Sequence, residues 1–299
     1  MRNGMRLLPG DTIGLVAIAR WVNPEFIEDA CRMISEWGYQ VVLGDTVHKK
    51  HNQFGGTDAE RAADLQAMLD NPNIKGIVTL RGGYGIIRLI DHLDFTAFTK
   101  HPKWIIGFSD VTILHAHIND KLGLPTLHAP MPYSWMHNTP EALLSLQHAL
   151  SGSPKPLQAP AHALNISGDV SAPLIGGNLS ILYSLLGTRY GFSTAGKILV
   201  IEDLDEYVYH IDRMMMSLQL AGKLDHIAGL VVGGMTDMKD HATPFGEDAE
   251  TIIHRLTAQL NIPVAFGMPF GHIDDNQTLV LGNTARLEVT ATGSVLTAL

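Results

Sequence analysis

Short apolar runs rich in β-branched residues alternate with segments of helical pattern through the first half of the chain. The apolar runs predict strands at residues 13–19, 40–43, 74–80, 104–108 and 126–128. The segments between them predict helices at residues 24–37, 58–69, 84–93, 111–122 and 140–150. Strands separated by helices of this length indicate a parallel sheet covered on both faces, so we predict an α/β fold for this half.

The regular alternation stops after residue 150. Residues 151–161 hold three prolines and show no helical period, so we predict a linker at about 152–172. It would separate an N-terminal domain, residues 1–155, from a C-terminal domain, residues 173–299, and two domains also suit a length of 299 residues. The second half is less regular. Its pattern predicts helices at 179–186, 210–220 and 249–260, strands at 197–202, 228–232 and 264–268, and a β tail at 279–299.

The composition narrows the class of protein. Apolar residues make up 45% of the chain and charged residues 17%, as in a well-packed soluble protein. The net charge is −9 and the 21 lysines and arginines do not cluster, so we expect no nucleic-acid partner. Residues 1–11 lack the apolar region of a secretory signal and no stretch is long enough to span a bilayer, so we expect a cytoplasmic protein without a membrane partner. The single cysteine, Cys31, excludes an internal disulfide and lies in a helical pattern, as a buried structural thiol would.

Glycine and polar residues follow several predicted strands, at the edge where open α/β sheets bind ligands. Residues 81–85, Arg-Gly-Gly-Tyr-Gly, suit either an oxyanion or anion site built from backbone N–H groups, or a tight turn. Residues 107–111 take the chain directly from a strand into a helix at Ser109, which resembles a nucleophile elbow although Val111 replaces the last glycine. Locally, a serine that caps the helix explains Ser109 equally well.

Three further strand ends carry ionisable side chains. They are His128 in residues 128–131, Glu202 at the head of the acidic run 202–206, and His272 in the Pro-Phe-Gly-His run 269–272. Each one, taken alone, is explained by a turn or a solvated loop. A metal site at His115 and His117 has poor geometry, because residues two apart on a helix face different sides. We expect no metal ion and no cofactor.

Together and in this order, these stretches resemble the LD-carboxypeptidase family, which includes the microcin C self-immunity peptidases. The matching positions are Thr57-Asp58 with Arg61, residues 81–85, 107–112, 128–131, 176–179 and 201–203, Tyr209 with 211–213, and 269–272. The first strand departs from the family pattern at residues 17–20, Ala-Ile-Ala-Arg, where the family more often has proline and small hydroxyl residues.

The resemblance implies a flavodoxin-like N-terminal domain, a smaller β-rich α+β C-terminal domain and a homodimer. It implies a triad in which Ser109 is the nucleophile, His272 the general base and Glu202 the residue that orients the histidine. Backbone N–H groups of Gly83 and Asp110 would form the oxyanion hole. Arg81 and Tyr84 are candidates for contact with the substrate, and Arg81 would bind its free carboxylate.

The implied substrate is a murein tetrapeptide, cleaved at the L,D bond before its terminal D-alanine during recycling of cell-wall fragments. One alternative within the family is an immunity-type peptidase that cleaves an aminoacyl-nucleotide amide. Another is a two-domain ligand-binding module without catalysis. A third is a metal hydrolase that uses His115, His117 and the acidic loop. The sequence separations of the three triad residues do not reveal whether these side chains meet.

Overall fold

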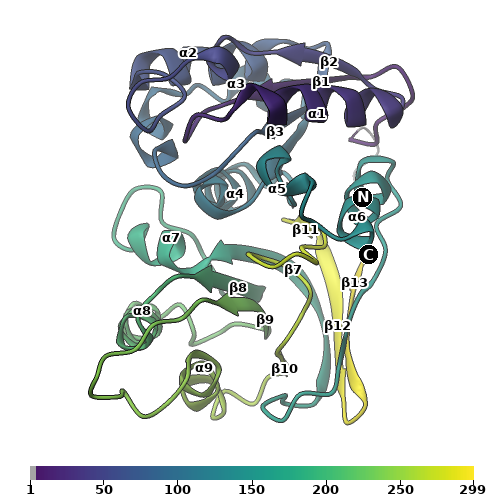
Figure 1. Ribbon diagram of the computed structural model, residues 1–299. Helices are drawn as coiled ribbons and strands as arrows, with labels where there is room; N and C mark the ends of the chain where they lie inside the picture. The colour runs from purple at the N-terminus through teal and green to yellow at the C-terminus, as the bar shows by residue number, and fades with distance from the viewer. Residues whose placement is uncertain (1–4) are drawn as a thin grey trace.

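The chain folds around two β-sheets, one in each half of the sequence (Figure 1). The structure is a computed structural model that describes residues 5–299; residues 1–4, part of the N-terminal stretch considered above, lie outside the described residues. In Figure 1 the N-terminal half, coloured purple to blue, lies above the green and yellow C-terminal half. None of the helices in residues 5–299 combines the length and apolar character that a membrane span requires.

The first sheet has five parallel strands in the spatial order β2-β1-β3-β4-β5, which is the flavodoxin-like order. The strands are β1 (Thr12–Val16), β2 (Gln40–Leu43), β3 (Ile74–Thr79), β4 (Trp104–Gly107) and β5 (Thr126–His128). A sixth strand, β11 (Leu279–Leu281), comes from the C-terminal half and pairs antiparallel with β5. The predicted α/β fold with a parallel sheet is therefore confirmed. The strand β11 lies within the β tail predicted over residues 279–299, but the sequence pattern did not indicate that it joins the first sheet.

Helices cover this sheet on both faces. They are α1 (Pro24–Glu36), α2 (Asp58–Asp70), α3 (Thr96–Lys100), α4 (Thr112–His117), α5 (Pro132–Trp135) and α6 (Pro140–Leu150). The helix α2 begins at a capping box, because the Thr57 side chain accepts from the Glu60 N–H while the Glu60 carboxylate accepts from the Thr57 N–H. In α1 the lone Cys31 is half-buried against the core, and burial raises the pKa of its thiol.

The helix predicted over residues 84–93 is wrong. Two 3₁₀ turns stand there, at Ile86–Arg88 and Ile90–His92. The local reason is Gly85, whose φ of 135° breaks the helical path, and the Ile86 N–H, which donates to the Asp110 carboxylate. The helix predicted over 111–122 is also shorter than expected, because α4 passes into a π-helical turn at Ile118–Leu122.

The second sheet has the order β10-β9-β8-β7-β12-β13-β6, parallel from β10 to β7 and antiparallel beyond it. Its strands are β6 (Leu157–Pro160), β7 (Gly168–Asn178), β8 (Ile198–Leu204), β9 (Gly229–Thr236), β10 (Val264–Ala265), β12 (Thr284–Thr290) and β13 (Gly293–Ala298). The region predicted as a linker, 152–172, therefore carries β6 and the start of β7. The domain boundaries themselves stay a prediction.

Both faces of the central strand β8 are buried. Leu199 and Ile201 pack toward the helices α7 (Leu179–Ser184), α8 (Val208–Leu220) and α9 (Ala249–Thr257), whereas Ile198 and Val200 pack toward the β12–β13 side. This double burial explains why the strand reads as an uninterrupted apolar run rather than an alternating one. Near its carboxyl end, Glu202 and Asp203 are buried acids at the junction between the two halves.

Candidate active site

Ser109 stands on a sharp turn at the carboxyl end of β4. Its φ of 62° lies in the left-handed region, which a residue with a side chain adopts at a cost. It does not cap the following helix: the N-cap of α4 is Val111, and no side-chain cap bond is formed there. Ser109 therefore does not make the hydrogen bond that a helix-capping serine would make. The strained strand-to-helix turn instead has the geometry of a nucleophile elbow.

The Ser109 side chain opens into a cavity of about 420 Å³. Arg81, Gly83 and His272, all predicted as site residues, line the same cavity. The His272 ring also lies against Phe108, the residue before Ser109, with ring centroids 4.7 Å apart. Within residues 5–299 the Ser109 hydroxyl makes no hydrogen bond, so it is free to meet a ligand in the cavity.

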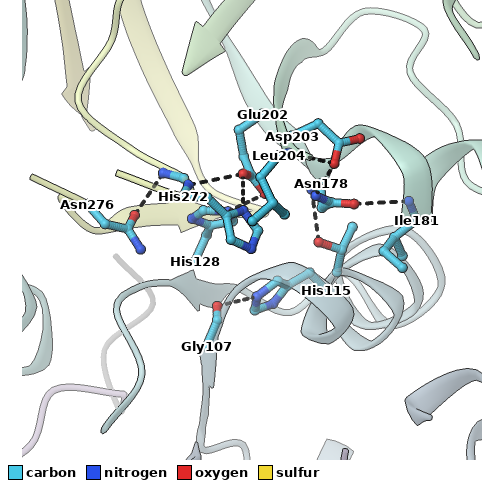
Figure 2. Close-up of polar contacts among 12 residues, drawn as sticks. Gly107, His115, His128, Asn178, Ile181, Glu202, Asp203, Leu204, His272 and Asn276 are labelled. Atoms are coloured by element: carbon cyan, nitrogen blue, oxygen red, sulfur yellow. Dashed lines mark hydrogen bonds and ion pairs between the residues drawn. The ribbon is translucent and has the colours of Figure 1, made fainter. Parts of the chain in front are cut away.

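His272 and Glu202 form a close pair at the wall of this cavity (Figure 2). The His272 Nδ1 lies 2.6 Å from Glu202 Oε2, and the His272 backbone N–H donates to the same oxygen at 3.2 Å. Glu202 is fully buried and His272 is 16% exposed. One carboxylate oxygen therefore fixes both the backbone and the ring of the histidine and leaves its Nε2 side free of this contact.

Charge stabilises the pair. Burial raises the pKa of the Glu202 carboxyl, but the charge and hydrogen bond of His272 outweigh burial and leave this pKa below its usual value. Burial lowers the pKa of the His272 imidazole, and the charge and hydrogen bond of Glu202 outweigh it, so this pKa is raised. A carboxylate that favours the imidazolium is what a general base needs when it takes up a proton.

A second histidine, His128, points toward Glu202 from the end of β5 (Figure 2). Its Nε2 lies 4.0 Å from Glu202 Oε1, and burial lowers the pKa of this imidazole to about 4. Behind it, His115 Nε2 contacts the Gly107 carbonyl at 2.8 Å, and burial lowers the pKa of His115 to about 3. Burial therefore favours the neutral form of both rings. His117 lies instead between Phe95 and Tyr190, so His115 and His117 have separate neighbours.

Contacts between the two halves bring His272 to the Ser109 edge. The loop after His272 is bound to the start of α6: Thr139 donates from its hydroxyl to Asp275 Oδ1 at 2.8 Å and from its N–H to the Asp274 carbonyl at 3.0 Å. At the other side, β7 meets α4 where the Asn178 N–H donates to Thr112 Oγ1 at 3.0 Å. The sequence alone gave no sign of these pairings.

The loop that carries Gly83 is held beside Ser109. A Cβ on Gly82 would lie 3.0 Å from Ser109 Cβ, so the two backbones are in close contact. The buried Asp110 carboxylate accepts from the Ile86 N–H at 2.9 Å, and burial raises the pKa of this carboxyl to about 6. The Asp110 amide lies in the 3₁₀ turn Ser109–Val111 that precedes α4, where the first N–H groups have no partner inside the turn.

The structure separates the two predicted substrate contacts. Arg81 lines the cavity, and its guanidinium lies 3.9 Å from the centre of the Tyr133 ring. Tyr84 is outside the cavity lining; the residue is 44% exposed, and its ring lies 6.2 Å from that of Phe54.

Three residues that we did not single out for the site also line the cavity. Arg20 follows β1, Asn178 ends β7, and Asp203 follows Glu202. Asp203 accepts from Asn178 Nδ2 and from two backbone N–H groups at 2.8–2.9 Å, and burial raises the pKa of its carboxyl to about 7. Their position at strand ends was the signal available in the sequence.

Two domain models that describe LD-carboxypeptidases match the chain. The N-terminal domain matches residues 13–129 and the C-terminal domain matches residues 171–287. Ser109 on its strand-to-helix turn lines the same cavity as His272, which is paired with Glu202, and this arrangement resembles that of serine peptidases. The chain belongs to the LD-carboxypeptidase family, and it is a peptidase.

Named relatives support this placement over nearly the whole chain. The chain is 32% identical to the "Probable murein peptide carboxypeptidase" of Bacillus subtilis, covering 97% of this chain and 92% of the relative. It is 30% identical to the "Murein tetrapeptide carboxypeptidase" of Pseudomonas aeruginosa, covering 92% of each. The crystal structure of muramoyltetrapeptide carboxypeptidase from Oxalobacter formigenes superposes with a TM-score of 0.87 at 30% identity, covering 95% of this chain and 97% of that one. The microcin C7 self immunity protein MccF, at 23% identity and a TM-score of 0.85 over 99% and 98% of the two chains, shares the fold.

Proposed function

We propose that the chain hydrolyses the L,D peptide bond that releases the terminal D-alanine from murein tetrapeptides, with Ser109, His272 and Glu202 as its triad. The observation that carries the proposal is the 2.6 Å pair of His272 and Glu202 on the wall of the cavity into which Ser109 opens. Relatives named for murein peptides supply the substrate class.

The reaction proceeds in two halves. His272 Nε2 takes the proton of the Ser109 hydroxyl as Oγ bonds to the peptide carbonyl carbon; the C–N bond then breaks, and the same proton passes to the departing D-alanine amine. Water next attacks the acyl-serine, gives a proton to His272 and releases the shortened peptide, and the proton returns to Ser109. Glu202 holds the ring and stabilises the imidazolium.

The tetrahedral oxyanion needs donors on the opposite side of the carbonyl from His272. Backbone N–H groups of Gly83 and Asp110 are the proposed donors, and each such donor contributes about 3–4 kcal/mol to transition-state stability in comparable sites. Gly83 has no hydrogen-bonded N–H within residues 5–299, and the Asp110 amide is at a helix start, where negative charge is favoured.

A single serine variant tests the proposal. We expect Ser109→Ala to release no D-alanine above background from a murein tetrapeptide and to lose labelling by a serine-directed phosphonate. Ser35→Ala, an exposed serine on α1, is the matched control and should keep both properties. Wild-type turnover by Ser109→Ala, with normal folding by circular dichroism, would refute the triad.

The remaining parts of the proposal concern context. We place the reaction in the cytoplasm, where recycled tetrapeptides are met, and we propose a homodimer; cell fractionation and light scattering test these two statements. An aminoacyl-nucleotide amide is the rival substrate, favoured by the shared fold with MccF. Faster cleavage of that amide than of the tetrapeptide would reassign the substrate while leaving the triad in place.

A further inference from the structure

Two arginines, Arg20 and Arg81, line one wall of the cavity that contains Ser109. Arg20 follows β1 and its side chain runs along Gly83: a Cβ on Gly83 would lie 2.7 Å from Arg20 Cδ and 2.8 Å from its Nε. Arg81 is held by its contact with the Tyr133 ring. Burial lowers the pKa of the Arg81 guanidinium, and the positive charge of Arg20 lowers it further, so the two cations lie within electrostatic range of each other.

These two cations are not neutralised by the protein. Across residues 5–299, neither guanidinium has a carboxylate oxygen within 4.0 Å. The acids that line the same cavity are already bound: Asp205 to Lys239 at 2.5 Å, Glu206 to His210 at 2.6 Å, and Asp203 to three N–H groups. The cavity therefore offers unused positive charge beside the nucleophile, and two like charges held together favour a ligand with two anionic groups.

We propose that Arg20 and Arg81 form a clamp for two carboxylates, in which Arg81 binds the terminal carboxylate of the peptide and Arg20 binds a second carboxylate close to the scissile bond. The inference rests on the proposed function and extends it to the choice among peptides. Arg20 becomes a specificity-determining residue: the enzyme selects peptides whose cleaved end carries two negative charges.

The position of Arg20 indicates where the second carboxylate lies. Gly83 is a proposed oxyanion donor, so the Arg20 side chain that runs along it is close to the reacting carbonyl. That carbonyl belongs to the residue before the scissile bond. A carboxylate on the side chain of this residue, as in diaminopimelate but not in lysine, is within the reach of the clamp; an acidic side chain on the leaving residue is the other source of the same chemistry.

Four tetrapeptides distinguish these sources: the third residue is diaminopimelate or lysine, and the fourth is D-alanine or D-glutamate. Their dissociation constants are measured by calorimetry on Ser109→Ala, with and without Arg20→Gln, and kcat/KM is measured on the corresponding proteins that retain Ser109. Arg32→Gln, an exposed arginine on α1, makes the same change in net charge outside the cavity and serves as the control.

We expect Ser109→Ala to bind the diaminopimelate peptide about tenfold or more tightly than the lysine peptide, as a hydrogen bond to a charged group provides. Arg20→Gln should reduce this preference to less than about threefold, whereas Arg32→Gln should keep it. A preference for D-glutamate that Arg20→Gln abolishes supports the clamp with the leaving residue as the source. Equal binding of all four peptides, or a preference that survives Arg20→Gln, overturns the clamp. If the protein that retains Ser109 binds the peptides selectively but hydrolyses none of them, the proposed function is refuted and the clamp is still supported.

Discussion

Replacing Glu202 by glutamine removes one charge from the buried pair and keeps the size of the side chain. In the wild-type chain the His272 ring and backbone both contact Glu202 Oε2, and Glu202 is fully buried. The amide of glutamine still offers an oxygen or a nitrogen at this place. The variant therefore separates the charge of Glu202 from its role as a filler of space.

The magnitude follows from the charge that is lost. An opposite charge at this separation favours the charged imidazole by about one to three pH units, so the pKa of His272 should fall by that amount in Glu202→Gln. Wild-type kcat/KM needs neutral His272 and should rise with pH through a pKa above the usual value of about 6.5, because that pKa is raised. In the variant the acidic limb moves to lower pH, because burial then opposes protonation with less compensation. We expect kcat/KM at its plateau to fall roughly 10³- to 10⁴-fold, or about 4–5.5 kcal/mol.

The assay is the release of D-alanine from a murein tetrapeptide between pH 4.5 and 9, with folding checked at each pH. Glu250→Gln is the matched control, because Glu250 lies on α9, pairs with His162 at 3.4 Å and does not line the cavity. An acidic limb that stays in place in Glu202→Gln, or a loss below tenfold, would refute His272 as the base that Glu202 orients.

Three further predictions concern the frame around the triad. Gly271→Ala should lower kcat/KM about 100-fold, because a Cβ at φ 98° would lie 2.6 Å from Glu202 Cβ and would displace the His272–Glu202 pair. The control is Gly267→Ala, where φ is 68° and a Cβ would meet open space; equal losses in the two variants would contradict this prediction. Asp110→Asn should raise the free energy of unfolding in urea by up to about 3 kcal/mol at pH 8 and hardly at all near pH 4. The reason is that the pKa of the Asp110 carboxyl is raised to about 6 in the folded chain, so its ionisation costs stability as the pH rises from the usual pKa through 6. A gain in stability that is independent of pH would contradict this prediction. Thr139→Ala should cost about 1 kcal/mol of stability and lower kcat, because the variant loses both the cap of α6 and the hydrogen bond to the loop after His272. Thr139→Ser should keep both contacts. Similar losses in the two variants would show that the hydroxyl is not the cause.

Local patterns in the sequence predicted the parts of the fold that depend on local physics. The strands of the first sheet are apolar runs with helices between them, and they emerge within a few residues of their predicted limits. The helix predicted after Tyr84 failed because a distant group, the Asp110 carboxylate, takes the Ile86 N–H. The strand β11 lies within the predicted β tail, but its pairing with the first sheet was not foreseen for a related reason, since its partner β5 lies about 150 residues away in the chain.

The candidate site divides in the same way. Strand ends and residue types were visible in the sequence. The family resemblance then selected Ser109, and it selected His272 from among 15 histidines and Glu202 from among 30 acidic residues. No pattern in the chain encodes the distance between these side chains, because it depends on contacts between the two halves. Arg20 was noted only as a departure from the family pattern, and its place beside Gly83 required the fold.

The sequence pattern suggested that the glycine-rich motifs bind ligands. The structure shows another physical reason for these glycines, which is close packing against neighbouring side chains. A Cβ on Gly82 would lie 3.0 Å from Ser109 Cβ, one on Gly177 would lie 2.5 Å from Thr112 Oγ1, and one on Gly271 would lie 2.6 Å from Glu202 Cβ. Each glycine therefore lets a backbone segment approach a side chain in or near the proposed triad. Two of these contacts draw together elements of the site itself, and the third joins β7 to α4 across the two halves. The motifs recur at strand ends because the site lies where the strand ends of the two sheets converge. The absence of a side chain at these glycines allows the segments to pack closely there.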